Sequence, residues 1–192
     1  MSVRTPIYLD SSVWLSYLLK DGNEAKAVKT LERLDRGNDK GIVSTLVILE
    51  ILDVMRKRIT EKESYQGESS STRGQIKSKV DTKTREFMDK ITKLAKQGKA
   101  AIVDPNKALG EFVTDALKLH SPHFGEIVTQ AYCPVCRGSF GPKYKYRGPG
   151  HWDIQHALNA KYTSANEIIS LDGDFEQLKA IKDFSSLTIT VL

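Results

Sequence analysis

Acidic side chains stand at five places where the surrounding apolar pattern predicts strand ends or helices. They are Asp10, Glu50, Asp153, Asp172 and Asp174. Asp10 directly follows the apolar residues 6–9, and Asp172 directly follows residues 168–171. Sites in open α/β sheets form beyond the carboxyl ends of the strands. We therefore expect acids that are far apart in the sequence to converge on that edge.

Each acid also has an ordinary structural explanation. Asp10 can cap a helix, Asp153 opens a helix where the dipole favours a carboxylate, and residues 172–174 can form a turn. Glu50 lies within the apolar residues 46–52, where an unpaired carboxylate is costly. An ion pair would satisfy Glu50 alone, whereas a shared divalent cation would explain all the acids, since crowded carboxylates repel one another. Oxygen ligands suit Mg²⁺ or Mn²⁺.

Short apolar segments alternate with helical patterns along the chain. Strands are predicted at residues 6–9, 42–43, 100–103, 168–171 and 187–191. Helices are predicted after Ser11 or Ser12 as the cap, over residues 24–34, from a cap at 44–45 to about 58, before Gly98, from 105, and over 152–162. This alternation predicts a three-layer α/β/α fold with a mainly parallel five-stranded sheet. Phe87, Ile91 and Leu94 form the apolar stripe of the helix before Gly98.

The length of 192 residues favours a single domain over residues 1–192. We expect two insertions in it, a polar exposed loop at about 60–81 and a Cys/His-bearing segment at about 120–150. The net charge of +5 suits a polyanionic partner such as RNA. A signal peptide and an apolar stretch long enough to span a membrane are both missing from the pattern, so we expect a cytoplasmic protein and no membrane partner.

The second expected insertion holds a candidate zinc site. Its four ligands would be His120, His123, Cys133 and Cys136, a sufficient tetrahedral set. Soft thiolates select zinc over magnesium, so this structural site would be distinct from the carboxylate site. The alternatives are a local disulfide, free thiols in a loop, and histidines that cap the preceding helix.

Basic and aromatic residues alternate after the cysteines. The candidates for RNA contact there are Lys143, Tyr144, Lys145 and Arg147. Cations can follow phosphates while aromatic rings stack on unpaired bases, although a solvated hairpin has the same pattern. Two histidines flank Asp153: His151 is either a substrate contact or structural, and we expect His156 to be structural.

Four short blocks together resemble the PIN-domain family. The blocks are residues 8–12, residues 44–46 with Glu50, residues 153–158 and residues 169–175, which contain the closing Asp-Gly-Asp-Phe. The resemblance covers residues 3 to about 119 and 150–192, and within the family it is greatest to the VapC-type toxin endoribonucleases. The chain is longer than a compact member, and both insertions are extra.

The resemblance implies a metal-dependent endoribonuclease in which a carboxylate-bound Mg²⁺ or Mn²⁺ promotes attack of water on phosphorus. Its acidic quartet would be Asp10, Glu50, Asp153 and Asp172, with Asp174 as an auxiliary acid. Ser12 or Ser170 would order a water or a phosphate near the metal. For a toxin, the family further implies a homodimer and a small antitoxin protein that covers the acidic edge.

Other functions are compatible with parts of the pattern. A haloacid-dehalogenase phosphatase would require an acid where Ser12 stands, and the acid pairs and lysine of a receiver domain are not evident. A ribosomal-RNA processing PIN nuclease would also combine this domain with a zinc element. A catalytically idle PIN scaffold that binds RNA or protein is the remaining alternative, and the intact acids argue against it.

Overall fold

The computed structural model describes residues 4–37, 39–64, 70–105, 111–112, 114–116, 119, 132–133, 138–139 and 150–192. Of the helix expected from residue 105, the described residues 111–112 and 114–116 are helical, and Ala116 is buried. Most of the expected Cys/His segment lies outside the described residues. Within it, β4 (Tyr132–Cys133) pairs antiparallel with β5 (Gly138–Ser139).

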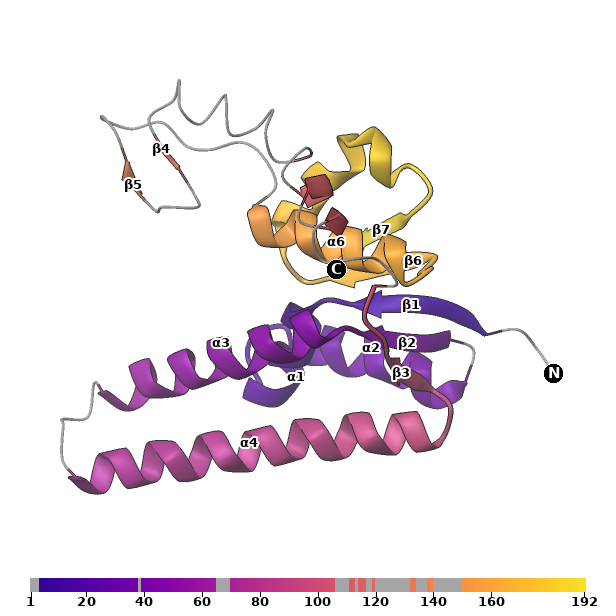
Figure 1. Cartoon of the computed structure of the whole chain (residues 1–192). Coiled ribbons are helices and arrows are strands. Elements are labelled where there is room, and N and C mark those ends of the chain that lie inside the picture. The colour runs from indigo at the N-terminus through magenta and orange to yellow at the C-terminus, as the bar shows by residue number, and fades with distance from the viewer. Residues whose placement is uncertain are drawn as a thin grey trace.

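Five parallel strands form the central sheet (Figure 1). They are β1 (Thr5–Leu9), β2 (Asp39–Val43), β3 (Ala100–Ile102), β6 (Glu167–Ser170) and β7 (Thr188–Val191). The strand order is β3-β2-β1-β6-β7, and every pair is parallel. The order therefore reverses direction at β1, which puts the carboxyl ends of β1 and β6 beside each other at the switch point of the sheet.

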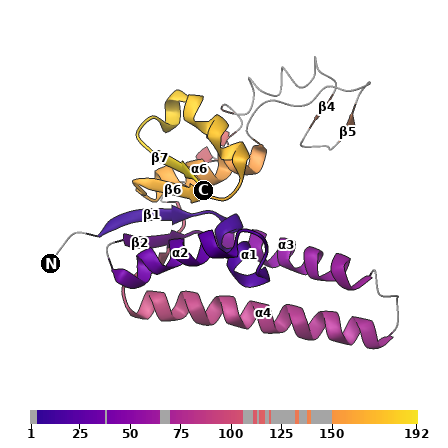
Figure 2. The same cartoon turned by 180° about the vertical axis from the view of Figure 1, so that it is seen from behind.

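Helices flank this sheet. They are α1 (Ser11–Leu19), α2 (Glu24–Arg36), α3 (Thr45–Ser64), α4 (Ser70–Lys96) and α6 (His151–Tyr162), with the 3-10 helices η1 (Gly173–Ala180) and η2 (Lys182–Phe184). Helix α1 packs on α2, α3 and α4, whereas α6 packs on η1 and β6. Figure 2 shows α1 and α3 next to one another with α4 along them. These two groups are the outer layers of the predicted α/β/α fold.

The prediction of a loop at residues 60–81 is wrong for residues 60–64 and 70–81, which are helical. Helix α3 continues to Ser64, α4 begins at Ser70, and residues 65–69 lie outside the described chain. Ile76 and Val80 pack against the core one helical turn apart, so they extend the apolar stripe of α4 toward its start. This packing outweighs the polar composition and the cost of about 1 kcal/mol for Gly74 inside a helix.

The cap of the first helix also differs from expectation. The side chain of Asp10, rather than that of Ser11 or Ser12, accepts a hydrogen bond from the Ser12 N–H at the start of α1. Asp10 has an extended backbone with a ψ of 157°, as a capping residue requires. The structural explanation of Asp10 is therefore correct, and it does not compete with a role in a site.

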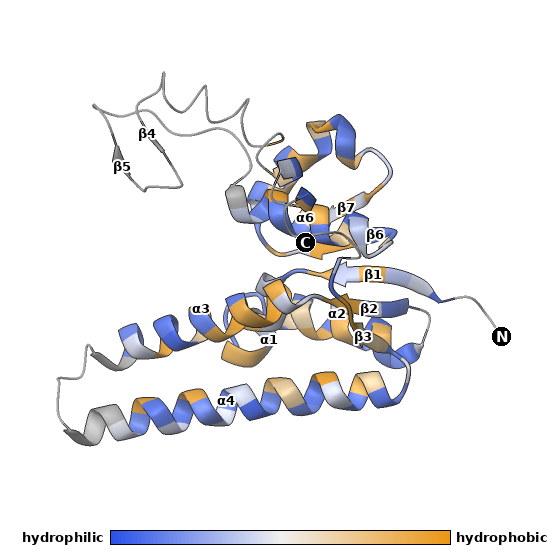
Figure 3. Ribbon diagram, viewed as in Figure 1, coloured by the Kyte–Doolittle hydropathy of each residue, from blue (hydrophilic) through white to orange (hydrophobic). Residues whose placement is uncertain are grey.

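The core lies between the sheet and the helices. Trp14 of α1 contacts Phe87 of α4 edge-on, with ring centroids 5.5 Å apart, and both side chains are fully buried. Ile91 and Leu94 are buried as well, which confirms the stripe expected on α4. Figure 3 shows hydrophobic and hydrophilic residues interleaved along the α4 ribbon, as an amphipathic helix requires. Among the described helices, none combines the length and the apolar character needed to cross a membrane.

At the amino edge of the sheet, charges are paired. Arg33 of α2 donates hydrogen bonds to Asp39 of β2 at 2.9 Å and to Glu167 of β6 at 3.0 Å. Burial alone would lower the pKa of Arg33, but its two carboxylate partners raise it overall. One guanidinium thus holds two acids from β2 and β6, the two strands that flank β1.

The packing of α4 can be tested with two adjacent residues. Phe87→Ala should lower the free energy of unfolding by about 3–5 kcal/mol, because it leaves a cavity against Trp14. Met88→Ala is the matched control, since that side chain is 39% exposed, and its cost should stay below about 1 kcal/mol. Urea denaturation measures both, and equal costs would contradict this placement of α4.

Candidate active site

Asp10 lies where β1 ends and α1 begins, and it is only 3% exposed. Its Oδ2 atom accepts hydrogen bonds from the Ser12 hydroxyl at 2.6 Å and the Ser170 hydroxyl at 2.9 Å, as well as from the Ser12 N–H. The Oδ1 atom faces His156, whose Nε2 lies 3.7 Å away. One oxygen of Asp10 is thus fixed by hydroxyl groups, and the other faces His156.

The two serines therefore hold Asp10 in place. Their hydroxyl groups also contact each other at 3.2 Å and accept hydrogen bonds from the Leu171 and Asp172 N–H groups. This network ties the start of α1 to the end of β6. The direct contact with water or phosphate that we expected for Ser12 and Ser170 remains a prediction, whereas their contact with Asp10 is present.

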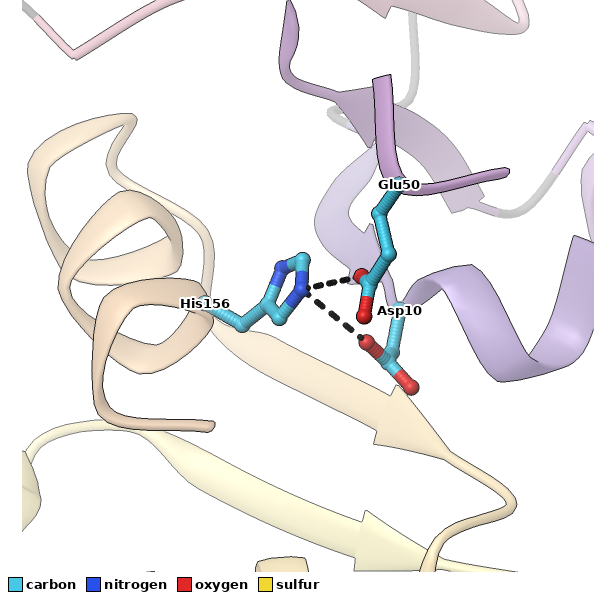
Figure 4. A group of neighbouring side chains, drawn as sticks. All are labelled: Asp10, Glu50 and His156. Atoms are coloured by element: carbon cyan, nitrogen blue, oxygen red, sulfur yellow. Dashed lines mark hydrogen bonds and ion pairs between the residues drawn. The ribbon is translucent and has the colours of Figure 1, made fainter. Parts of the chain in front are cut away.

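Glu50 of α3 meets His156 of α6 in the same place (Figure 4). The His156 Nε2 atom lies 2.6 Å from Oε2 of Glu50, and the ring is 1% exposed. On its other side, Nδ1 lies 3.0 Å from the buried Tyr8 hydroxyl, which is 2.8 Å from the Ser44 hydroxyl. Glu50 of α3 and Tyr8 of β1 therefore contact the two nitrogens of the histidine ring. Ser44, between β2 and α3, contacts the Tyr8 hydroxyl.

The sequence interpretation of His156 as merely structural missed this contact with two of the predicted acids. A signal was present, because residues three apart on a helix share a face and His156 follows Asp153 by three. The neighbouring Ile154 and Ala157 are fully buried, so a histidine between them required a polar partner.

The charges of Glu50 and His156 stabilise each other. Burial alone would raise the pKa of Glu50, but the hydrogen bond and the charge of His156 lower it overall. Burial alone would lower the pKa of His156, but the hydrogen bond to Glu50 and the nearby charge of Asp10 raise it overall. Both shifts favour an imidazolium paired with a carboxylate.

Asp153 lies in the first turn of α6, where its Oδ2 accepts a hydrogen bond from the Gly150 N–H at 2.7 Å. Burial raises the pKa of Asp153 to about 6, and the negative charges of Asp172, Asp10 and Asp174 add to the effect. The Gly150 hydrogen bond opposes it. Asp172, Asp10 and Asp174 therefore lie near enough to Asp153 for their charges to act on it.

Asp172 and Asp174 are at the rim of this cluster. Asp172 follows β6 and caps η1, since its Oδ1 accepts from the Asp174 N–H at 3.0 Å. Both side chains are exposed, unlike Asp10. They make the expected turn, and they also raise the pKa of Asp153, so the two explanations of this segment hold together.

The donor chemistry of the cluster fits a divalent cation. One ligand atom from each of Asp10, Glu50 and His156 lies within 4.8 Å of the others. A protonated His156 would bring one positive charge to Glu50, Asp10 and Asp153, and a cation would neutralise the negative charge that remains. Asp10 and Glu50 would hold Mg²⁺ or Mn²⁺, with Asp153 adjacent.

The other expected site residues cannot be placed. His120, His123, Cys136, Lys143, Tyr144, Lys145 and Arg147 lie outside the described residues. Cys133 is in β4, where its backbone pairs with Gly138, and its side chain is likewise outside the described part. The zinc and RNA contacts assigned to this segment therefore remain predictions.

The electrostatic penalty at Asp153 predicts a pH-dependent stability. In EDTA at pH 8, Asp153→Asn should be more stable than the wild type by about 1–3 kcal/mol, because the variant keeps the acceptor for Gly150 and loses the repelling charge. The pKa of Asp153 is higher in the folded than in the unfolded protein. The difference in stability between the variant and the wild type should therefore shrink as the pH falls from 7 to 4, because Asp153 becomes protonated. Urea titrations across this range measure it. A difference that grows on acidification would contradict the crowding of acids.

Comparison with known proteins agrees with this geometry. The PIN domain family matches residues 7–104, slightly more than half of the chain, and the match includes Asp10 and Glu50. No match was found among curated proteins. With the parallel sheet and the acidic cluster at its carboxyl edge, the match shows that the chain belongs to the PIN domain family, whose fold is that of metal-dependent nucleases.

Proposed function

We propose that this protein is a metal-dependent endoribonuclease that hydrolyses RNA phosphodiester bonds at the cluster of Asp10, Glu50 and Asp153. One observation carries the proposal. Side chains from the end of β1, from α3 and from α6 meet at one edge of the sheet, although Asp10 and Asp153 are 143 residues apart in the sequence. The fold that brings them together is that of a nuclease family.

The residues of the cluster have distinct roles in this proposal. Asp10, Glu50, Asp153 and Asp172 would hold the cation, which, when bound, lowers the pKa of water and stabilises charge on phosphate oxygens. The hydroxyl groups of Ser12 and Ser170 keep Oδ2 of Asp10 fixed, so that Oδ1 faces the centre. Asp174, exposed at the rim, is the auxiliary acid.

His156 keeps the acids assembled. Its imidazolium attracts both Glu50 and Asp10, whose mutual repulsion would otherwise push α3 away from β1. Tyr8 fixes the other ring nitrogen, so the ring cannot turn away from the acids. We assign His156 to positioning, and the carboxylates to binding the cation and accepting the proton of water.

RNA as the substrate is supported by the net charge of +5 and by the basic-aromatic residues 143–147. We further propose a toxin of the VapC type, with a homodimer and an antitoxin, on the resemblance of the four blocks alone. A ribosomal-RNA processing nuclease is the second candidate, because the His120, His123, Cys133 and Cys136 pattern adds a zinc element to the domain.

The function is tested first by cleavage of mixed RNA substrates with Mn²⁺ or with EDTA. We expect Mn²⁺-dependent cutting that falls by at least about 100-fold in Asp10→Asn and Glu50→Gln, since each loses a cation ligand worth several kcal/mol. Asp53→Asn is the control, because this exposed acid lies one turn after Glu50 and pairs with Arg56.

Two outcomes would contradict the nuclease. Equal cutting by Asp10→Asn and the wild type would assign the activity to a contaminant. No Mn²⁺ binding by the folded wild type in calorimetry would favour the catalytically idle scaffold that binds RNA or protein.

The proposed structural zinc has its own test. Cys133→Ser should lower the melting temperature of the protein, and elemental analysis of the wild type should find about one zinc per chain. A site with four protein ligands has no open position for substrate, so Mn²⁺-dependent cleavage at permissive temperature should change less than the stability does. Absence of zinc together with an unchanged melting temperature would refute it.

A further inference from the structure

Two adjoining hollows lead away from the acidic cluster. The smaller one, about 220 Å³, is bordered by Ser12 and Asp172 at one end and by Asp21 and Arg58 at the other. The larger one, about 510 Å³, is bordered by the same Asp21 and Arg58 and continues between α1, α3 and α4. The two hollows adjoin at the ion pair of Asp21 and Arg58, and the smaller one extends to Ser12 and Asp172 beside the acidic cluster.

The larger hollow is basic around an apolar floor. Its four cationic side chains are Arg58, Lys62, Lys79 and Lys83. Leu19 and Ile59 supply apolar surface, and Asp21 is the acid that borders the hollow. The environment is thus the opposite of that at the far end of the smaller hollow, where Asp172 and the acids around it repel anions.

Two cations of the basic hollow, Arg58 and Lys83, pair with acids at partly exposed positions. Arg58 and Asp21 are 3.6 Å apart, and their side chains are 51% and 35% exposed, so water screens this pair. Lys83 pairs with Glu86 within α4 and is also partly exposed. Exposed pairs of this kind contribute little to stability, and their cations can turn to a stronger anionic ligand at small cost.

We infer that the two hollows, here together called the basic path and defined by their residues, bind the strand of RNA that extends beyond the scissile phosphate. The inference rests on the proposed function. Phosphates of the strand contact the four cations, while riboses or bases cover Leu19 and Ile59.

Helix α3 sets the register between the two parts. It carries Glu50 in the acidic cluster and Arg58 on the path, eight residues later. Eight residues of a helix span about 12 Å, and a helix does not stretch, so the distance from the cutting centre to the first cation is fixed. The extension of α3 and α4 into the expected loop supplies Lys62 and Lys79, whereas Lys83 lies in the part of α4 that the sequence already predicted as helix.

An acidic peptide would also match the cations of the larger hollow. Continuity with Ser12 and Asp172 favours RNA, because a strand held at the acidic cluster must leave it along the surface, and the smaller hollow opens directly there.

The test measures RNA binding rather than cleavage. Fluorescence anisotropy is recorded with Asp10→Asn protein and labelled single-stranded RNA of about 4 and about 12 nucleotides, lengths within the usual range of single-strand sites. We expect the long strand to bind more tightly. Lys62→Glu with Lys83→Glu should weaken long-strand binding at least about tenfold and reduce its salt slope by about 1.4, while short-strand binding changes little.

The control applies the same charge change farther along α4. Lys93→Glu with Lys96→Glu alters two exposed lysines that do not border the path, and it should leave the length dependence intact. Lys62→Gln is a milder variant for the case that the double variant does not fold, because Lys62 is exposed on α3. It should weaken long-strand binding in the same direction.

Several results would overturn the basic path. The first is an equal loss of long-strand binding in the path and control variants, and the second is no loss in the path variants. The third is an oligo-glutamate peptide that binds the protein more tightly than RNA does and binds the Lys62 variants less tightly. If the wild type cleaves RNA but the Lys62 and Lys83 variants keep the same length dependence of RNA binding, the path alone is refuted. Path-dependent binding without any Mn²⁺-dependent cleavage would refute the nuclease alone.

Discussion

Repulsion between carboxylates at the carboxyl edge of one parallel sheet is the constraint on which the rest of the structure depends. The N-termini of three helices offset part of this repulsion. Asp10 caps α1, Asp172 caps η1, and Asp153 in the first turn of α6 accepts the Gly150 N–H. Backbone N–H groups and helix dipoles thus compensate part of the negative charge without using basic side chains. The pKa of about 6 at Asp153 shows that the compensation is incomplete.

The two edges of the sheet handle acids in different ways. At the amino edge, Arg33 pairs with both Asp39 and Glu167, and the charges are matched. At the carboxyl edge, His156 is the cation that contacts the acids among the described residues, and it reaches Glu50 and Asp10 while Asp153 remains strained by its neighbours. An edge where acids outnumber cations among the described residues is suited to bind a cation, and a fold that is stable elsewhere can tolerate it.

The hairpin of α3 and α4 contributes residues both to the acidic cluster and to the proposed RNA-binding path. Its inner side packs Phe87 against Trp14 and fixes α3, so that Glu50 is held at the cluster. The same two helices carry the four cations that border the larger hollow next to α1. A rigid element that bears both a cluster acid and the path's first cation would couple where the strand binds to where it is cut.

The sequence alone predicted the parallel α/β fold, the approximate bounds of the five strands and the convergence of Asp10, Glu50 and Asp153. These features follow from local patterns, because apolar periodicity predicts elements and the carboxyl ends of parallel strands must share an edge. Only the tertiary structure decided the helical course of residues 60–64 and 70–81, the contact of His156 with Glu50 and Asp10, and the gathering of cations around one hollow. Each of these depends on which elements pack side by side: α4 on α1 and α3 for the helix, α6 on α3 for the histidine, and the α1, α3 and α4 surfaces for the cations. Such contacts join residues distant in the chain, and local sequence patterns signal them only weakly, as the spacing of His156 from Asp153 does.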